Sequence, residues 1–76
     1  MREFIEFIAK RLVDQPDEVV LQEETQDDKL VYTLKVAKDD VGKIIGRKGR
    51  TAQALRVLLT AVGAKEGKRV LLHVAD

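Results

Sequence analysis

The spacing of apolar side chains divides this chain into segments of regular structure. In residues 2–13 they recur every three or four positions, which is typical of an amphipathic helix, and Pro16 ends this helix because proline cannot continue one. The stripe comprises Phe4, Ile5, Ile8, Ala9 and Leu12. In residues 29–37 apolar and polar side chains alternate, which indicates a half-buried strand. A weaker strand at residues 18–25 precedes it across a short polar turn, so we expect an antiparallel hairpin.

The second half of the chain predicts two more helices and a final strand. A short helix is expected over Asp40–Ile45, with Asp39 as its N-cap and Gly46 at its end. A longer helix should follow over Arg50–Ala64, and Arg69–Val74 should form the last strand. The buried stripe of the long helix is predicted to be Ala52, Leu55, Leu58, Leu59 and Val62.

This order of helix, strand, strand, helix, helix and strand predicts an α+β fold in one domain, residues 1–76. A strand–helix–helix–strand crossover favours parallel strands, so the last strand should lie parallel to residues 29–37. We therefore expect a three-stranded mixed sheet with three helices on one face.

The composition excludes several kinds of chemistry. Cysteine and serine are absent and His73 is the only histidine, which excludes thiolate catalysis, a serine nucleophile and a multi-histidine metal site. Nothing in the sequence indicates an enzyme or a cofactor site. No apolar run approaches the roughly 20 residues that span a bilayer, and the absence of cysteine fits a cytoplasmic protein. We interpret Tyr32, Phe4 and Phe7 as packing residues and His73 as an ordinary strand residue.

Charge is unevenly distributed along the chain, although the formal net charge is only +1. The segment from residue 14 to residue 28 holds seven acids and no Lys or Arg, namely Asp14, Asp17, Glu18, Glu23, Glu24, Asp27 and Asp28. The segment from residue 41 to residue 56 holds five bases and no acid, namely Lys43, Arg47, Lys48, Arg50 and Arg56. Such segregation favours one surface that attracts phosphates. Within the basic segment, we interpret Lys43 and Arg56 mainly as solvated charges.

The basic segment is centred on two glycines, Gly46 and Gly49, which bracket Arg47 and Lys48. Glycine lacks a Cβ, so a phosphate can approach the backbone closely there. The helix expected from Arg50 would direct its free N–H groups to the same place. The alternative interpretation is a plain turn between two helices. A P-loop is excluded, because it needs four residues between its glycines, followed by Lys and Ser or Thr.

The run from Ile44 to Thr51 resembles the Ile-Gly-x-x-Gly signature of a KH domain, and the order of elements resembles the type II arrangement. Nearly the whole chain is similar to the small stand-alone KH proteins of bacteria, the KhpA (YlqC-like) family. The resemblance also rests on the helix closed by Asp14–Asp17 and on the lead-in from Asp40 to Gly42.

The resemblance implies binding of single-stranded RNA, with the loop on the backbone and apolar side chains under the bases. The residues it implicates are Val41, Lys43, Ile44, Ile45, Gly46, Arg47, Lys48, Gly49, Arg50 and Thr51. The last strand, from Arg69 to Leu72, would form the opposite wall. The family is thought to act as RNA chaperones or post-transcriptional regulators alongside a KhpB-like partner, and is linked to cell-wall synthesis and cell length. The alternative hypothesis is a protein–protein adaptor with little RNA binding.

The long helix also carries a second apolar stripe of small and medium side chains: Ala54, Val57, Leu58 and Ala61. An exposed apolar stripe often marks an interface. We therefore expect self-association, or pairing with a related KH protein, through this helix.

Overall fold

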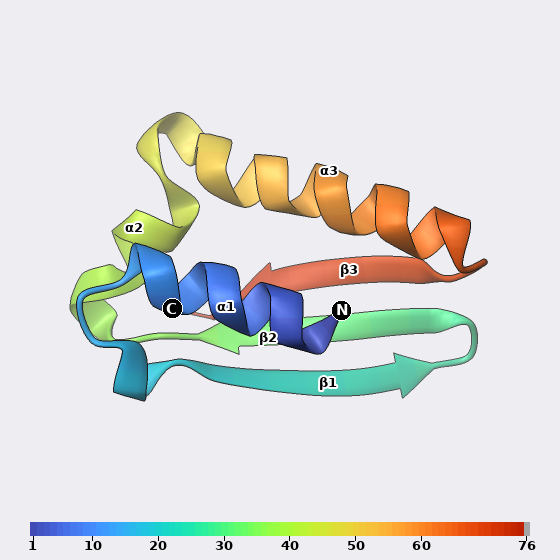
Figure 1. Ribbon diagram of the computed structural model, residues 1–76, viewed down its shortest axis with the longest axis horizontal. Helices are drawn as coiled ribbons and strands as arrows, with labels where there is room; N and C mark the ends of the chain where they lie inside the picture. The colour runs from blue at the N-terminus through green and yellow to red at the C-terminus, as the bar shows by residue number, and fades with distance from the viewer. Residues whose placement is uncertain (76) are drawn as a thin grey trace.

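The structure is a computed structural model, and it describes residues 1–75. Its elements follow the order expected from the sequence (Figure 1). They are the helices α1 (Arg2–Leu12), α2 (Val41–Ile45) and α3 (Arg50–Lys65), and the strands β1 (Val20–Gln26), β2 (Lys29–Lys35) and β3 (Arg69–Val74). Short 3-10 turns lie at Pro16–Glu18, Lys38–Asp40 and Arg47–Gly49. Within residues 1–75 no helix is long and apolar enough to cross a bilayer.

The three strands form one mixed sheet in the order β1-β2-β3. β1 pairs with β2 in antiparallel register, with Leu21 opposite Leu34. β3 lies parallel to β2 with Tyr32 opposite Leu72, so the crossover through α2 and α3 has the parallel geometry expected for it. The predicted α+β fold with a mixed sheet is confirmed.

One hydrophobic core lies between the helices and the sheet. Alternation along the strands directs Leu21, Tyr32, Leu34 and Leu72 toward the helices, and all four side chains are buried. The helices supply the other side of this core with Ile5 and Ala9 from α1, Ile44 from α2, and Leu55 and Leu59 from α3. Burial and the neighbouring Glu23 carboxylate both raise the pKa of Tyr32, so its phenol stays neutral at physiological pH.

The face that α3 presents to the sheet differs from the predicted stripe. The buried positions are Ala52, Leu55, Leu59 and Gly63. Leu58 is 53% exposed and Val62 is 43% exposed, so their assignment to the core was wrong. Each lies one residue before a buried position, which places it about 100° around the helix axis. Gly63 takes the place of a larger residue because a Cβ there would lie 2.6 Å from Val70 Cγ2.

The two phenylalanines of α1 also lie outside the core. Phe4 is 42% exposed and Phe7 is 59% exposed, whereas Tyr32 is buried as expected. The Arg11 guanidinium stacks over the Phe7 ring at 5.5 Å from its centroid. The packing role predicted for Phe4 and Phe7 is therefore corrected: both rings lie mainly at the surface.

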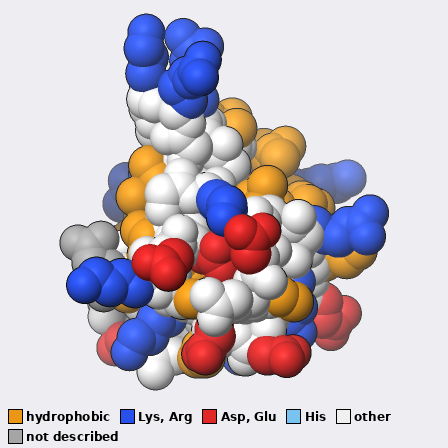
Figure 2. Space-filling model, turned by 90° about the vertical axis from the view of Figure 1, so that its left-hand side faces the viewer, with side chains coloured by type: hydrophobic (Ala, Val, Ile, Leu, Met, Phe, Trp, Pro, Cys, Tyr) orange, Lys and Arg blue, Asp and Glu red, His pale blue; other side chains and the backbone are white. Residues whose placement is uncertain are grey.

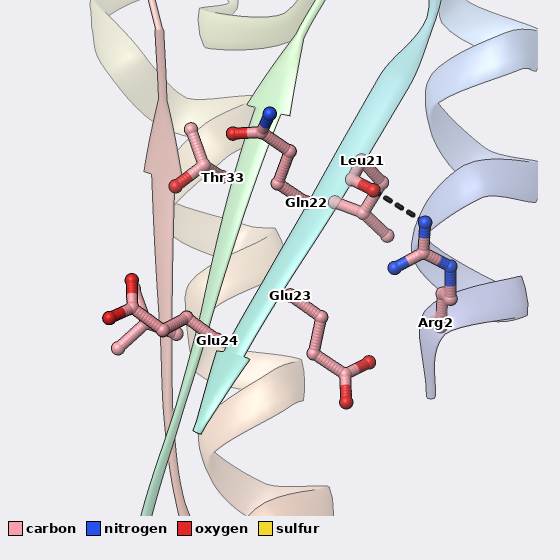
Figure 3. Close-up of a pocket in the computed structure, with 7 residues that line it drawn as sticks. Arg2, Leu21, Gln22, Glu23, Glu24 and Thr33 are labelled. Atoms are coloured by element: carbon pink, nitrogen blue, oxygen red, sulfur yellow. Dashed lines mark hydrogen bonds between the residues drawn. The ribbon is translucent and has the colours of Figure 1, made fainter. Parts of the chain in front are cut away.

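The outer edge of β1 is partly covered by α1. Arg2 Nη2 donates a hydrogen bond to the Leu21 carbonyl oxygen, and Figure 3 shows the guanidinium reaching from α1 to this edge. The hollow beside it, about 550 Å³, is lined partly by Glu23 and Glu24. These carboxylates would repel a phosphate backbone, so this hollow is not a candidate nucleic-acid site.

Candidate nucleic-acid interface

The loop between α2 and α3 has a backbone that depends on its glycines. Gly46 has φ 79° and ψ 171°, which ends α2 in a region open almost only to glycine. Lys48 and Gly49 follow in the left-handed region, with φ of 57° and 73°. A Cβ on Gly46 would lie 2.6 Å from Thr51 Cβ, whereas a Cβ on Gly49 would meet nothing within 4 Å. Thr51 therefore packs against Gly46 and fixes the loop on the first turn of α3.

The basic side chains of the loop lie at an exposed tip. Figure 2 shows Lys and Arg side chains gathered where this tip projects from the rest of the molecule, with Asp and Glu side chains below them. Arg47, Lys48 and Arg50 are exposed and form no ion pair with residues 1–75. Their charges are therefore available to an external anion.

The three apolar residues expected to line a groove beside the loop have different environments. Ile44 is only 2% exposed and packs in the core, so of the two isoleucines Ile45 is the one open to an external ligand in this structure. Ile45 is 36% exposed, and Val41 is half-buried beside a shallow hollow of about 560 Å³. Val41 and Ile45 are thus the apolar side chains that an external strand could touch.

Lys43 is held by two carboxylates instead of being simply solvated. Its Nζ lies 2.5 Å from Asp14 Oδ2 and 3.4 Å from Asp40 Oδ1. The hydrogen bond to Asp14 is the main cause that raises the pKa of Lys43. Because its charge is largely compensated, Lys43 adds less to the attraction of phosphates than the three cations of the tip.

Asp40 is the buried polar residue that supports this part of the fold. Its Oδ1 accepts a hydrogen bond from the Asp14 N–H at 3.3 Å, and its Oδ2 accepts one from the Gln15 N–H at 3.1 Å. Burial alone would raise the pKa of Asp40, but these N–H groups and the Lys43 ammonium outweigh it and lower that pKa.

Asp40, and not the predicted Asp39, stands at the N-cap position of α2, although its carboxylate makes no capping hydrogen bond to that helix. Asp39 makes no capping hydrogen bond, and residues Lys38–Asp40 form a 3-10 turn before α2. Sequence reasoning missed the role of Asp40 because its backbone partners lie 25 and 26 residues away, and no pattern of side chains marks them.

Arg56 also has a specific contact that the sequence did not indicate. Its Nε donates a hydrogen bond to the Leu72 carbonyl oxygen at 3.2 Å, which links α3 to the outer edge of β3. The interpretation of Arg56 as a solvated charge is therefore corrected.

The strand expected to form the opposite wall of the groove, from Arg69 to Leu72, has one apolar side chain open to a ligand and one that is not. Leu71 is 44% exposed, whereas Leu72 is buried.

Comparison with known proteins places this arrangement among characterised sequences. The family model described as "KhpA/KhpB, KH domain" matches residues 2–74. A protein named "RNA-binding protein KhpA" from Chlamydia trachomatis is 45% identical over 76 residues, covering 100% of this chain and 97% of the relative. Proteins of the same name are 46% identical in Clostridium acetobutylicum, covering 97% of this chain and 99% of the relative, and 45% identical in Listeria monocytogenes, covering 100% of both.

Proposed function

We propose that this chain, which belongs to the KhpA/KhpB family of KH domains, binds single-stranded RNA at the loop between α2 and α3. The observation that carries the proposal is the projecting tip at Gly46–Gly49, where Arg47, Lys48 and Arg50 have no internal ion-pair partner within residues 1–75. The printed names of the relatives, RNA-binding protein KhpA, support the same ligand. The protein acts by holding the strand, and no catalytic step is part of the proposal.

The proposed binding mode assigns a role to each part of the loop. The backbone at Gly46 and Gly49 lets a phosphate approach, and the three tip cations neutralise it. Val41 and Ile45 lie under the bases next to that phosphate. Ile44, Lys43 and Thr51 support the loop: Ile44 from the core, Lys43 through its carboxylates, and Thr51 through its contact with Gly46.

In the cell, we propose that the chain acts in the cytoplasm as an RNA chaperone or post-transcriptional regulator. Family resemblance supports pairing with a KhpB-like KH protein and a link to cell-wall synthesis and cell length. One module with few phosphate contacts binds weakly, and a second module on the same strand would raise the overall affinity through effective concentration.

Self-association through α3 is the second part of the proposal. The side chains expected to take part are Ala54, Val57, Leu58 and Ala61. Val57 is 62% exposed and Leu58 is 53% exposed in the monomer. Phe4 and Ile8 of α1 line a hollow of about 340 Å³ together with Ala54 and Leu58. A second copy of the chain or a KhpB-like partner could bind to this apolar surface. The same surface is the feature that favours the alternative function as a protein–protein adaptor.

RNA binding is tested by charge reversal at the tip. Binding of the wild type and the Arg47→Asp/Lys48→Asp variant to a labelled single-stranded RNA of mixed sequence is measured by fluorescence anisotropy. If about three phosphates are contacted, raising the salt concentration from 50 to 200 mM should weaken wild-type binding about 20-fold, and the variant should lose most of its binding. The matched control is Lys10→Glu/Arg11→Glu on α1, which changes the charge equally at another exposed pair. Absence of wild-type binding would favour the adaptor.

A further inference from the structure

The outer edge of β3 lies beside α3, and Arg56 connects the two. β3 is an edge strand of the sheet, so one side of its backbone has no neighbouring strand. The Leu72 carbonyl points to that side, because it accepts the hydrogen bond from Arg56 Nε at 3.2 Å. The orientation of the guanidinium relative to β3 is therefore set by the backbone of the sheet.

Most of the hydrogen-bonding capacity of Arg56 is unused. A guanidinium has five N–H donors, and the bond to Leu72 uses the one on Nε. The two terminal nitrogens, which form the planar fork, make no hydrogen bond or ion pair with any other residue in the part of the chain described here. The side chain is exposed, so the fork is open to a ligand.

The surroundings of this fork differ from those of the loop tip. Gln53, Arg56 and Thr60 follow one another at helical spacing and line a hollow of about 540 Å³, with Val57 and Ala61 beside them. Thr60 Oγ1 donates to the Arg56 carbonyl oxygen at 2.8 Å, which fixes the hydroxyl. The hollow thus combines donors on α3 with Val57 and Ala61, which can lie against a base while α3 is uncovered. A second copy on α3 would cover these two side chains, so the two uses of this face exclude each other.

Arg56 lies farther along α3 than the glycine loop, where the contact with the RNA backbone is proposed. Arg56 lies seven positions after Gly49, which corresponds to about 10 Å along α3. A strand held by a phosphate at the tip and running along α3 would present a different nucleotide to Arg56.

We propose that Arg56 reads a guanine in the bound strand, with its terminal N–H groups donating to O6 and N7 of the base. This proposal rests on the proposed function, because it requires RNA on the loop. Arginine bidentate to guanine O6 and N7 is the common specific contact of this side chain with a base. A phosphate is the other acceptor group of RNA that a fork could bind, but the exposed cations of the tip suit a phosphate, whereas an oriented fork beside apolar side chains suits a base.

The test compares short single-stranded RNAs in anisotropy titrations. An oligouridine octamer is compared with three octamers that carry one guanine, one 7-deazaguanine or one adenine in the centre. Wild-type protein should prefer the guanine octamer over oligouridine by about tenfold, and 7-deazaguanine, which lacks the N7 acceptor, should lose most of that preference. Arg56→Lys keeps the charge but removes the planar fork, so the ratio of the dissociation constant for oligouridine to that for the guanine octamer should fall well below the wild-type value. Arg11→Lys on α1 is the matched control and should leave the ratio unchanged.

The possible outcomes separate this proposal from the one on which it rests. The assignment of Arg56 is overturned if Arg56→Lys keeps the full wild-type preference for the guanine octamer over oligouridine. It is also overturned if the wild type binds the guanine and 7-deazaguanine octamers equally well. Wild-type binding of equal strength to all four octamers overturns it too and leaves RNA binding intact. Failure of the wild type to bind any octamer overturns both. The 7-deazaguanine comparison uses unaltered protein, so it decides the question even if Arg56→Lys folds poorly.

Discussion

The buried carboxylate of Asp40 accepts a hydrogen bond from the backbone N–H of Gln15 at 3.1 Å, which ties the segment after α1 to the start of α2. α2 leads directly into the glycine loop, so this contact helps to set where the loop lies. The same carboxylate also accepts the Asp14 N–H and faces the Lys43 ammonium. No other charged side chain among residues 1–75 is buried.

We predict that Asp40→Asn destabilises the fold, although it preserves the shape of the side chain. The amide has one acceptor oxygen in place of two, so its NH₂ group would face one of the backbone donors, and Lys43 would lose a charged partner. The melting temperature, followed by circular dichroism, should fall by several degrees. Asp39→Asn is the matched control, because Asp39 makes no capping hydrogen bond and is exposed. Equal melting temperatures for both variants would contradict the role given to Asp40.

The lowered pKa of Asp40 also predicts how stability depends on pH. In the unfolded chain this carboxyl takes up a proton near pH 4, whereas in the folded protein it does so at lower pH. Below about pH 4 the unfolded state therefore binds more protons than the folded state. The stability that the Asp40 carboxylate contributes is lost as the pH falls through its lowered pKa. Urea midpoints measured between pH 5.5 and pH 3 should decrease in the wild type and decrease less in Asp40→Asn. Parallel curves would show that Asp40 has no part in the acid response.

Substitution of the two loop glycines should have unequal effects. Gly49→Ala adds only left-handed backbone strain, about 1–2 kcal/mol, because its Cβ would meet nothing within 4 Å. Gly46→Ala should cost roughly 1–3 kcal/mol more, because its Cβ would overlap the Thr51 side chain. Chemical denaturation gives both free energies of unfolding. Similar losses for the two variants would mean that Thr51 does not fix the loop.

Truncation of neighbouring leucines on α3 should distinguish its two faces. Leu59→Ala removes a side chain that is 1% exposed and should lower the free energy of unfolding by about 2–5 kcal/mol. Leu58→Ala removes one that is 53% exposed and should change it by less than about 0.5 kcal/mol in a monomer at low concentration. A large loss at Leu58 under those conditions would place that residue in the core, as the sequence pattern suggested.

Self-association through α3 is tested by Leu58→Glu in sedimentation velocity. The wild type should sediment as a dimer whose fraction rises with concentration, and the charged variant should sediment as a monomer with an intact circular dichroism spectrum. Val20→Glu on β1 replaces a similarly exposed apolar residue, 48% exposed, and should still dimerise. A wild type that remains monomeric at every concentration argues against the homodimer.

Local patterns were sufficient to predict the fold. Alternation in residues 29–37 identified β2. The strand ends at Lys35, so the predicted strand was two residues too long. β1 runs over Val20–Gln26 instead of 18–25, since its weak pattern gave no sharp boundary. The glycine loop was located correctly, because its glycines and cations are adjacent in the sequence.

Most of the hydrogen bonds that were missed join residues far apart in the chain. The bond from Arg56 to Leu72 spans 16 residues, and the bond from Lys43 to Asp14 spans 29. Both side chains look like solvated charges when only their neighbours in the sequence are considered. The pattern on α3 was misread for a related reason: leucines at 55, 58 and 59 fit more than one helical face. Contacts with a distant strand, such as the close approach of Gly63 to Val70, fix which face meets the sheet.

The central claim is that a single strand of RNA lies against the bend at Gly46–Gly49, and NMR titration tests it most directly. Amide shifts of ¹⁵N-labelled protein are followed while an unlabelled single-stranded RNA is added at moderate salt. The account predicts that the largest changes occur at Gly46, Arg47, Lys48, Gly49 and Arg50, with smaller ones along α3 toward Arg56. Changes centred on the β1–β2 hairpin, or no changes at saturating RNA, would contradict it.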